Sequence, residues 1–420
     1  MSVAGSMERA GSGRSLAVAT PWHPTAQRPF AGSFVQATTA AVSGFFDSVR
    51  LYHTEDWPGP ADPVQARLVE RAYRALTSGP RARVAFEPRW TREGYWVTDI
   101  ATPVTPKRDY AAWARSHESA LRQALPSGRF DADVVHGHVG IYGGWLAHRF
   151  ARPGARIVVT EHASFLGRIL GQPRSRALYA EVVDRADAFV CVSEKLRGQL
   201  VDAFPQHAAK IQVVPNVVAI EQLPQRPEAV TGLNRWIYVG KVAAGKGVPE
   251  LVEAFAAVAK EEPALRLTIL GSGPLLEPLR ERAAQLGRAD RIAFPGAVPP
   301  QRVFEFLHAH DLLVHPSKSE TFGMTVVEAV GSGMPVLVTR CGGPQETLAG
   351  LEGVAGLLID VSDDPEVIVE GYRRLAGQVT RLDPARARSV LIERYGTRAV
   401  AARLAAVYGV EQSVQAEERV

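Results

Sequence analysis

Two glutamates, Glu320 and Glu328, are the residues best placed by type and spacing to bind a ligand. Seven residues separate them, and the segment that ends at the turn 331–333 has the pattern of a helix opening near Phe322. At about 1.5 Å of rise per residue, the two carboxylates would stand roughly 12 Å apart along the helix axis. A pyrophosphate with a sugar at each end has a similar length, so each glutamate could bind the hydroxyl groups of one sugar.

The predicted start of this helix offers a site for an anion. Free backbone N–H groups at Gly323 and Met324, together with the positive end of the helix dipole, would suit a phosphate. The alternative is purely structural, because a carboxylate in the first helical turn is ordinary dipole compensation and glutamates are common on helices. The neighbouring motifs decide between these interpretations.

A second candidate anion site follows the predicted strand at 235–240. Lys241 and Lys246 lie five positions apart on a loop that also contains Gly245 and Gly247. Two ammonium groups on such a loop can close on a diphosphate as point charges. A solvated loop without a ligand is the alternative.

Two further motifs carry weaker signals. The Gly-Ser-Gly run at 271–273 matches half of a dinucleotide-binding fingerprint, but the third glycine is missing, so it is interpreted as a strand-to-helix turn beneath a bound base. His136 and His138 point to the same side of one strand end, because side chains alternate along a strand. For either histidine alone, a hydrogen-bonded structural role is the commoner alternative.

The alternation of strands and helices indicates an α/β fold. Short apolar strands alternate with helices of about 10–15 residues in two blocks, on either side of a linker at 219–234. This pattern predicts two doubly wound domains with parallel sheets, in which ligands bind beyond the carboxyl ends of the strands. We expect a disordered terminus over 1–14, a first domain over 15–218, a second domain over 219–395 and a final helix over 396–412.

The composition narrows the class of protein. Of 420 residues, 46% are hydrophobic and 22% charged, which is ordinary for a globular protein with full cores. The net charge is +4 without a run of Lys or Arg, so nucleic-acid binding is not favoured. No apolar stretch reaches about 18 residues and 1–14 lacks the apolar core of a signal peptide, so we expect a cytoplasmic protein without a membrane span. Peripheral contact with a membrane stays open. Cys191 and Cys341 are expected to be buried thiols rather than a disulfide.

The stretch from Ser319 to Ala329, followed by 333–339, resembles the E-x7-E region of the family 4 retaining glycosyltransferases. The resemblance extends over about 17–408 and is stronger in the second half of the chain. It implies the GT-B fold, in which two Rossmann-like doubly wound domains face each other. It also implies a C-terminal helix that crosses back to the first domain.

In the second domain, the resemblance implies a role for each motif. Lys241 and Lys246 match the family's basic pair that neutralises the leaving nucleoside diphosphate, with a lysine at the first position where the family usually has an arginine. Glu320 would bind hydroxyl groups of the donor sugar, and Glu328 would bind the ribose. The other implied donor-binding positions are Leu275, Val298, Phe322, Gly323 and Met324.

In the first domain, the resemblance implies three more site residues. His138 matches the family's active-site histidine near the donor sugar, and His162 is expected on the acceptor side. Gly32, at the entrance of a helix, would place a backbone amide near the diphosphate. Residues 54–130 are interpreted as largely irregular, apart from a helix near 110–125, and would shape much of the acceptor site.

The implied activity is transfer of a sugar, with retention, from a nucleotide sugar to a hydroxyl group of a small-molecule, cyclitol, saccharide or natural-product acceptor. UDP is the commonest carrier in the family, and GDP stays open. We expect no cofactor and no metal. Asp131 and Asp133 form the D-x-D metal motif of another glycosyltransferase fold, but they precede a strand of the first domain and are interpreted as a turn.

Two other functions stay open on the sequence. A nucleotide-sugar epimerase on the same scaffold would need a carboxylate for proton abstraction in the first domain, and Glu161 is the candidate. An NAD-dependent dehydrogenase would have to bind its cofactor at 271–273, where the fingerprint is incomplete.

Overall fold

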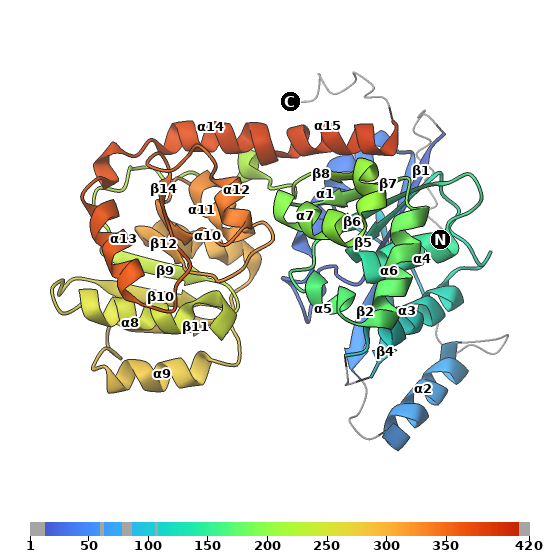
Figure 1. Ribbon diagram of the computed structural model, residues 1–420, viewed down its shortest axis with the longest axis horizontal. Coiled ribbons are helices and arrows are strands. Elements are labelled where there is room, and N and C mark those ends of the chain that lie inside the picture. The colour runs from blue at the N-terminus through green and yellow to red at the C-terminus, as the bar shows by residue number, and fades with distance from the viewer. Residues whose placement is uncertain (1–12, 59–62, 78–85, 106–107, 411–420) are drawn as a thin grey trace, which may run out of the picture. The chain divides into compact units, whose positions relative to one another are not determined.

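The chain divides into two compact units in a computed structural model that describes residues 13–410, apart from 59–62, 78–85 and 106–107. One unit comprises Met1–Val214 and Ala401–Val420, and the other comprises Pro215–Val400. Each unit contains one sheet flanked by helices (Figure 1). The predicted disorder of 1–14 falls almost entirely outside the described residues.

The sheet of the first unit has eight strands in the order β3-β4-β2-β1-β5-β6-β7-β8. Neighbouring strands are parallel, except for the antiparallel pair β3 and β4. The strands are β1 (Ser15–Thr20), β2 (Ser48–Pro58), β3 (Arg89–Trp90), β4 (Trp96–Val104), β5 (Val134–His138), β6 (Arg156–Glu161), β7 (Ala188–Cys191) and β8 (Ile211–Val213). The helices are α1 (Ser33–Val42), α2 (Pro63–Thr77), α3 (Tyr110–Ala124), α4 (Trp145–Phe150), α5 (Leu166–Leu170), α6 (Pro173–Arg185) and α7 (Glu194–Ala203).

The sheet of the second unit has six parallel strands in the order β11-β10-β9-β12-β13-β14. These are β9 (Arg235–Val239), β10 (Arg266–Leu270), β11 (Ile292–Gly296), β12 (Leu312–His315), β13 (Val336–Thr339) and β14 (Gly356–Ile359). The helices are α8 (Val248–Val258), α9 (Leu276–Gln285), α10 (Pro300–Ala309), α11 (Met324–Gly331), α12 (Gly343–Thr347), α13 (Glu366–Ala376) and α14 (Pro384–Tyr395). Two doubly wound α/β units therefore confirm the predicted fold class.

Parallel strands that helices cover on both faces explain the continuous apolar runs in the sequence. Every residue of β5, β12 and β13 is buried. In the second unit, the ring of Trp236 on β9 packs on Phe255 of α8 at 5.9 Å and on Tyr372 of α13 at 4.8 Å. The apolar strands and the helices thus form one core within this unit.

The strand order reverses once in each sheet, and the reversal marks where a ligand can bind. In the first unit the chain winds outward from β1 through β2 and β4, then continues on the other side of β1 from β5. In the second unit the same change occurs between β9 and β12, which are neighbours. Open α/β sheets bind ligands beyond the carboxyl ends of the strands at this switch point. His138 ends β5, and Lys241 and Glu320 follow β9 and β12.

The interpretation of residues 54–130 as largely irregular was wrong. β2 extends to Pro58, α2 covers Pro63–Thr77, and β4 contributes nine residues to the sheet. Polar residues and Pro103 hid β4 in the sequence. Because β3 pairs only with Trp96 and Val97, the later part of β4 is a sheet edge, where a proline is tolerated.

The last helix, α15 (Thr397–Tyr408), ends in the core of the first unit. The Tyr408 hydroxyl lies 2.8 Å from His136 Nδ1, and its ring packs on Phe46 at 5.6 Å. Arg156 Nε also donates a hydrogen bond to the carbonyl of Val407 at 2.8 Å. The expected return of the C-terminal helix to the first domain is therefore confirmed.

Tyr408→Phe should lower the free energy of unfolding by about 1–3 kcal/mol, because it leaves the buried Nδ1 of His136 without its hydroxyl partner. Urea unfolding followed by circular dichroism measures this loss. Tyr372→Phe is the matched control, since the hydroxyl of Tyr372 bonds to no described residue. Equal stability of the two variants would contradict the anchoring role of Tyr408.

Candidate active site

Two loops at the switch point of the second unit, 240–247 after β9 and 316–323 after β12, pack directly on each other. Gly247 has a φ of 67°, and a Cβ at this position would lie 2.0 Å from the carbonyl oxygen of Pro316. The backbone N–H of Lys318 donates to the carbonyl of Gly245 at 3.1 Å. Glycine is thus required where the two backbones touch. The contact makes one surface from two predicted motifs.

Lys246 and Glu320 form an ion pair across this surface. The Nζ of Lys246 lies 2.6 Å from Oε1 of Glu320, and Nε2 of His315 lies 3.1 Å from the same oxygen. Burial alone would raise the pKa of Glu320, but the hydrogen bond and charge of His315 and the charge of Lys246 outweigh it and lower this pKa to about 2. Glu320 is therefore a carboxylate at any pH at which the protein functions.

The sequence analysis did not identify His315. It ends the apolar run of β12, so its pattern is that of a strand residue and nothing nearby in the sequence marks it. Tyr238 on β9 stacks on its ring, with centroids 6.1 Å apart and 12° between the planes. The hydroxyl of Tyr238 also donates to the carbonyl of Lys241 at 2.8 Å. Tyr238 thereby supports both the histidine and the lysine loop.

Lys241 differs from Lys246 in its surroundings. Its side chain is exposed and forms no ion pair with a described residue. Lys246, by contrast, is partly covered and neutralised by Glu320. The two lysines predicted to act as a pair therefore differ in their surroundings: Lys241 has no carboxylate partner among the described residues, whereas Lys246 is paired with Glu320.

The helix after Glu320 begins later than predicted. Gly323 adopts a left-handed conformation with a φ of 90° and caps α11, whose first residue is Met324. Glu320 lies before this turn in a bridge to Gly342, so the estimate of its distance from Glu328 along a helix axis was wrong. The N–H groups of Gly323 and Met324 bond to no described residue, and they remain at the helix start as predicted.

The side chain of Phe322 faces the interior of the second unit. Its ring is buried and meets the ring of Tyr395 edge-on, at 5.3 Å and 89°. A Cβ on Gly343 would lie 2.4 Å from the backbone nitrogen of Phe322. Phe322 therefore fixes the loop that leads to α11, and its backbone rather than its ring is the part that could meet a ligand.

Glu328 on α11 has the opposite electrostatics to Glu320. It is half-buried, and no described residue donates a hydrogen bond to its carboxylate. Burial raises its pKa from 4.5 to about 7. Its carboxylate oxygens therefore have unused hydrogen-bonding capacity among the described residues.

Two of the expected donor-binding residues, Leu275 and Val298, lie beside the neighbouring strands. Leu275 precedes α9, its N–H donates to the carbonyl of Val242 at 3.2 Å, and its side chain packs against the core of the second unit. A Cβ on Gly273 would lie 2.2 Å from the same carbonyl, so the turn packs closely on the lysine loop. Val298 follows β11 and is buried.

The structure separates the two histidines that the sequence could not. Both ring nitrogens of His136 are bonded, Nδ1 to Tyr408 and Nε2 to Thr160 at 2.7 Å. His138 bonds through Nδ1 to Nε2 of His162 at 2.9 Å, while its own Nε2 is buried and bonds to no described residue. Burial, with His136 and His162 nearby, lowers the pKa of His138 well below its usual value. His136 is structural, and His138 has capacity for a ligand.

Backbone strain is concentrated beside His138. Val139 is the one non-glycine among the described residues with a positive φ, 67°, and it opens the tight segment Val139–Gly144. A Cβ on Gly143 would lie 2.1 Å from the carbonyl oxygen of Ala19, so this segment packs on the end of β1. Gly32 has a φ of 70°, and a Cβ there would lie 2.3 Å from the carbonyl oxygen of Trp22. Val139 is a β-branched residue held at a positive φ, and such backbone strain is typical of a functional site.

Glu161 is fully engaged in holding this strained segment. Its Oε1 accepts from the N–H groups of His162 and Ala163 at 2.9 and 2.7 Å, and its Oε2 accepts from the N–H of Gly140 at 3.1 Å and the hydroxyl of Tyr179 at 2.6 Å. Burial raises its pKa despite these bonds. Its carboxylate has no oxygen left for proton abstraction, which removes the main support for an epimerase.

The second acidic residue of the D-x-D motif, Asp133, also has a structural role. Asp133 accepts from the N–H and the hydroxyl of Ser15 at 2.8 and 2.9 Å and forms an ion pair with Arg152. Among the described residues, no group of three or more His, Cys, Asp or Glu side chains could hold a metal ion. Cys191 and Cys341 are both buried, and neither is in a disulfide.

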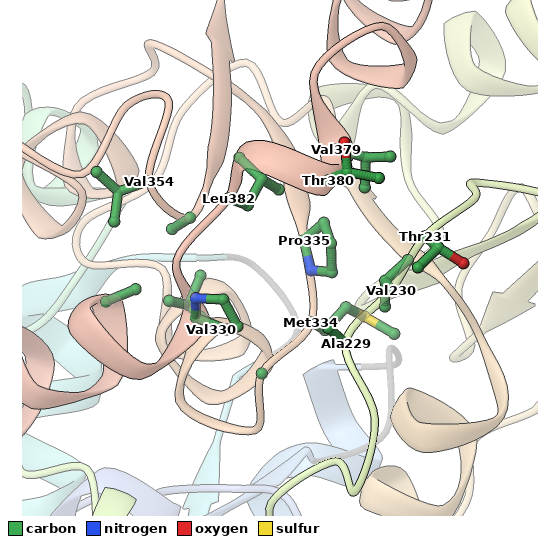
Figure 2. Close-up of a pocket in the computed structure, with 14 residues that line it drawn as sticks. Ala229, Val230, Thr231, Val330, Met334, Pro335, Val354, Val379, Thr380 and Leu382 are labelled. Atoms are coloured by element: carbon green, nitrogen blue, oxygen red, sulfur yellow. The ribbon is translucent and has the colours of Figure 1, made fainter.

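An apolar cavity of about 100 Å³ lies elsewhere in the second unit. Figure 2 shows Val330, Met334, Pro335 and Leu382 around it. Pro335 precedes β13, so the cavity adjoins the amino end of that strand rather than the carboxyl edge where the lysine and glutamate loops meet. Its lining contains no titratable side chain, and it does not belong to the candidate active site.

Two family models match the chain. "Glycosyltransferase Family 4" matches residues 49–222, and "Glycosyl transferases group 1" matches residues 219–378. The chain is 32% identical over 280 residues to the D-inositol 3-phosphate glycosyltransferase of Acidothermus cellulolyticus, covering 60% of each chain. It is 30% identical over 310 residues to the protein of the same name in Thermobispora bispora, covering 67% of this chain and 71% of the relative. The chain belongs to glycosyltransferase family 4.

Solved structures share the fold over nearly the whole chain. A sucrose-phosphate synthase from Thermosynechococcus elongatus aligns with a TM-score of 0.71 at 16% identity, over 94% of this chain and 98% of that chain. The Anabaena protein HepE, in complex with UDP and glucose, aligns with a TM-score of 0.65 at 15% identity, over 94% and 99%. The fold is therefore GT-B. The matched region spans 60% and 63% of the length of two curated relatives. Within the described residues, no helix has both the length and the apolar character needed to cross a bilayer.

The raised pKa of Glu328 makes a prediction about stability. The folded chain holds a proton on Glu328 up to about pH 7, whereas the unfolded chain releases it near pH 4.5, so folding is favoured below pH 4.5 and this contribution is lost as the pH rises through 7. Glutamine cannot ionise, so the free energy of unfolding of Glu328→Gln should rise relative to that of wild type as the pH increases from 5 to 8. The expected rise is about 1–2 kcal/mol after allowance for the partial exposure of Glu328.

Urea unfolding of both proteins at the two pH values measures this gain. Glu305→Gln, an exposed position on α10, is the control, and its difference from wild type should not depend on pH. A pH-independent difference for Glu328→Gln as well would show that Glu328 ionises normally.

Proposed function

We propose that this protein transfers a sugar, with retention at the anomeric carbon, from a UDP-linked donor to a hydroxyl group of an acceptor. The observation that carries the proposal is the joined surface of the second unit. There, Glu320 is ionised between Lys246 and His315, while no described residue donates to the carboxylate of Glu328. Two loops that pack on each other, together with helix α11, thus offer two carboxylates for hydroxyl groups and two lysines for phosphates.

Departure of a nucleoside diphosphate leaves an oxocarbenium-like sugar and an anion. We assign stabilisation of that anion to Lys241, to Lys246 and to the unpaired amides of Gly323 and Met324, because fixed donors aimed at developing charge lower the barrier most. We also propose that Lys246 turns from Glu320 to the phosphate, so that donor binding exchanges a carboxylate–ammonium pair for a phosphate–ammonium pair.

Sugar recognition would rest on carboxylates and on an unpaired histidine nitrogen. We assign Glu320 to hydroxyl groups of the donor sugar and Glu328 to the ribose. In the first unit, we assign Nε2 of His138 to a sugar hydroxyl and His162 to the acceptor side, because the hydrogen bond between the two rings fixes the orientation of His138. Gly32 would supply a backbone amide to the diphosphate.

The names of similar proteins suggest the substrates. The UDP bound by the Anabaena protein supports a UDP-linked donor, and the D-inositol 3-phosphate glycosyltransferases support a phosphorylated cyclitol as acceptor. We propose that the reaction needs no metal and no cofactor, since lysines and backbone amides are available for the phosphate charge. Both substrates are proposals for this chain.

Donor hydrolysis tests the proposed function. The purified protein should release UDP from one member of a panel of UDP- and GDP-sugars, and inositol 3-phosphate should accelerate that release. NMR of the product should show the anomeric configuration of the donor. Turnover should survive EDTA, and a loss that magnesium or manganese restores would refute metal independence. If no nucleotide sugar were turned over with or without acceptor, the proposal would fail.

The two glutamates should respond differently to substitution. Glu328→Gln should weaken UDP binding about tenfold or more, because a charge-assisted hydrogen bond to the ribose contributes about 1.5–3 kcal/mol. Glu320→Gln should reduce transfer at least tenfold yet leave UDP affinity unchanged or higher, because free UDP has no donor sugar and Lys246 is released from its ion pair.

Calorimetry with UDP and initial rates with the donor separate these effects, with Glu305→Gln as the control for a helix glutamate on the surface. Unaltered UDP affinity in Glu328→Gln would remove the ribose assignment.

A further inference from the structure

Glu320 is held through only one of its two oxygens. Lys246 and His315 both contact Oε1, and no described residue donates to Oε2. The carboxylate is largely enclosed, with 15% of its side chain exposed. The side chain of Lys246 is 27% exposed and that of His315 is 5% exposed. The lysine is therefore the more exposed of the two partners, and the histidine is the more enclosed.

In the proposed reaction, Lys246 leaves Oε1 of Glu320 when the donor binds. When Lys246 turns to a diphosphate, Glu320 loses one of its two partners in a place where burial alone favours its protonated form. An enclosed carboxylate left without a partner takes up a proton or reorients. Either change would spoil its use as an acceptor for sugar hydroxyls. A second donor must hold Glu320 while the lysine is engaged elsewhere.

His315 meets that need, and its ring has no other hydrogen bond to a described residue. Its Nε2 must carry a hydrogen, because the carboxylate it faces can only accept. Its Nδ1 is buried and bonds to no described residue. His136, a structural histidine, shows the contrast, because both of its nitrogens are bonded. Burying the ring of His315 with only one of its nitrogens hydrogen-bonded lowers the stability of the fold. The hydrogen bond to Glu320 is the interaction that the protein gains in return.

The ring is fixed in place by its surroundings. His315 ends β12, every residue of which is buried, and the ring of Tyr238 stacks on it. The titratable groups that face it are Glu320 directly, Lys246 through the shared Oε1, and Tyr238. The hydroxyl of Thr339 on the neighbouring strand approaches the carbonyl of His315 at 3.5 Å.

We infer that His315 is a positioning residue for the transfer reaction: it keeps Glu320 ionised and directs Oε2 to the donor sugar after Lys246 has moved to the diphosphate. This role rests on the proposed function. In this role, the contact of Lys246 with Oε1 is lost when the donor binds, whereas the contact of His315 with Oε1 is kept. His315 does not touch the donor itself.

Kinetics of two substitutions test the role. His315→Phe keeps an aromatic ring against Tyr238 but removes the donor to Glu320. It should lower kcat/KM for the donor at least tenfold at pH 7, leave UDP affinity within about threefold of wild type, and move the acidic limb of the pH profile upward by a unit or more. His315→Gln, which retains an N–H donor, should restore part of the rate. His310→Gln is the control, a half-buried histidine bonded to Thr268 and Phe306.

A double-mutant cycle supplies a readout that does not depend on turnover. Glu320 has a lowered pKa, so its ionised form contributes stability above about pH 4.5 that is lost as the pH falls toward 2. The drop in Tm caused by His315→Phe should therefore be larger at pH 7 than at pH 3.5, and it should shrink in a Glu320→Gln background.

The outcomes separate this role from the function on which it rests. A wild-type protein without turnover would overturn the proposed function, and the role of His315 with it. With turnover present, either an unchanged pH profile in His315→Phe or the absence of coupling to Glu320 would overturn the role of His315 alone. A loss of UDP affinity as large as the loss of kcat/KM would show that the substitution damages the whole surface.

Discussion

The contact between the lysine and glutamate loops is the constraint on which the candidate site depends. Lys246 and Glu320 can pair because the two backbones touch at Gly247 and Pro316, where no side chain fits. The pair satisfies a carboxylate that is otherwise enclosed, and breaking a partly buried pair without replacement is costly. A ligand that supplies its own anion to Lys246 and its own hydroxyl groups to Glu320 replaces both partners at once. The resting ion pair thus keeps the site charged and ordered until such a ligand arrives.

The same topological rule places the residues of both units. Each sheet changes winding direction once, between β1 and β5 or between β9 and β12. At the first change lie Gly32, the strained Val139 and the half-satisfied His138, and at the second lie the two loops that carry Lys241, Lys246 and Glu320. Strain, unpaired polar atoms and shifted pKa values are all unfavourable for folding alone. Their occurrence together at the two switch points is the physical signature of binding surfaces.

The sequence predicted the features that depend on local pattern and missed those that depend on tertiary contact. Alternating apolar strands and helices indicated two doubly wound units, and the motifs that contain Lys246 and Glu320 lie on two loops that pack on each other. His315 was missed because its partner Glu320 comes close only through the turn after β12. The helix start was placed too early because Gly323 adopts a positive φ and caps α11, which therefore begins only at Met324. His136 and His138 share one strand face, and only their partners distinguish them. The strand β4 was missed because its polar residues and its proline hide a pattern that an edge position tolerates.

The two glutamates show how one short segment prepares for two different contacts. Glu320 lies before Gly323, where the chain is extended and meets Lys246 and His315, so its charge is stabilised before any ligand binds. Glu328 lies on α11 among buried neighbours and has no donor, so its charge is disfavoured until hydroxyl groups reach it. A ligand that binds Glu320 gains little free energy unless it also replaces Glu320 as the partner of Lys246. A ligand that binds Glu328 relieves the cost of burying a carboxylate without a hydrogen-bond donor. Under the proposed function, affinity for a nucleotide should therefore come mainly from Glu328 and the phosphate contacts, whereas Glu320 would bind the sugar that reacts.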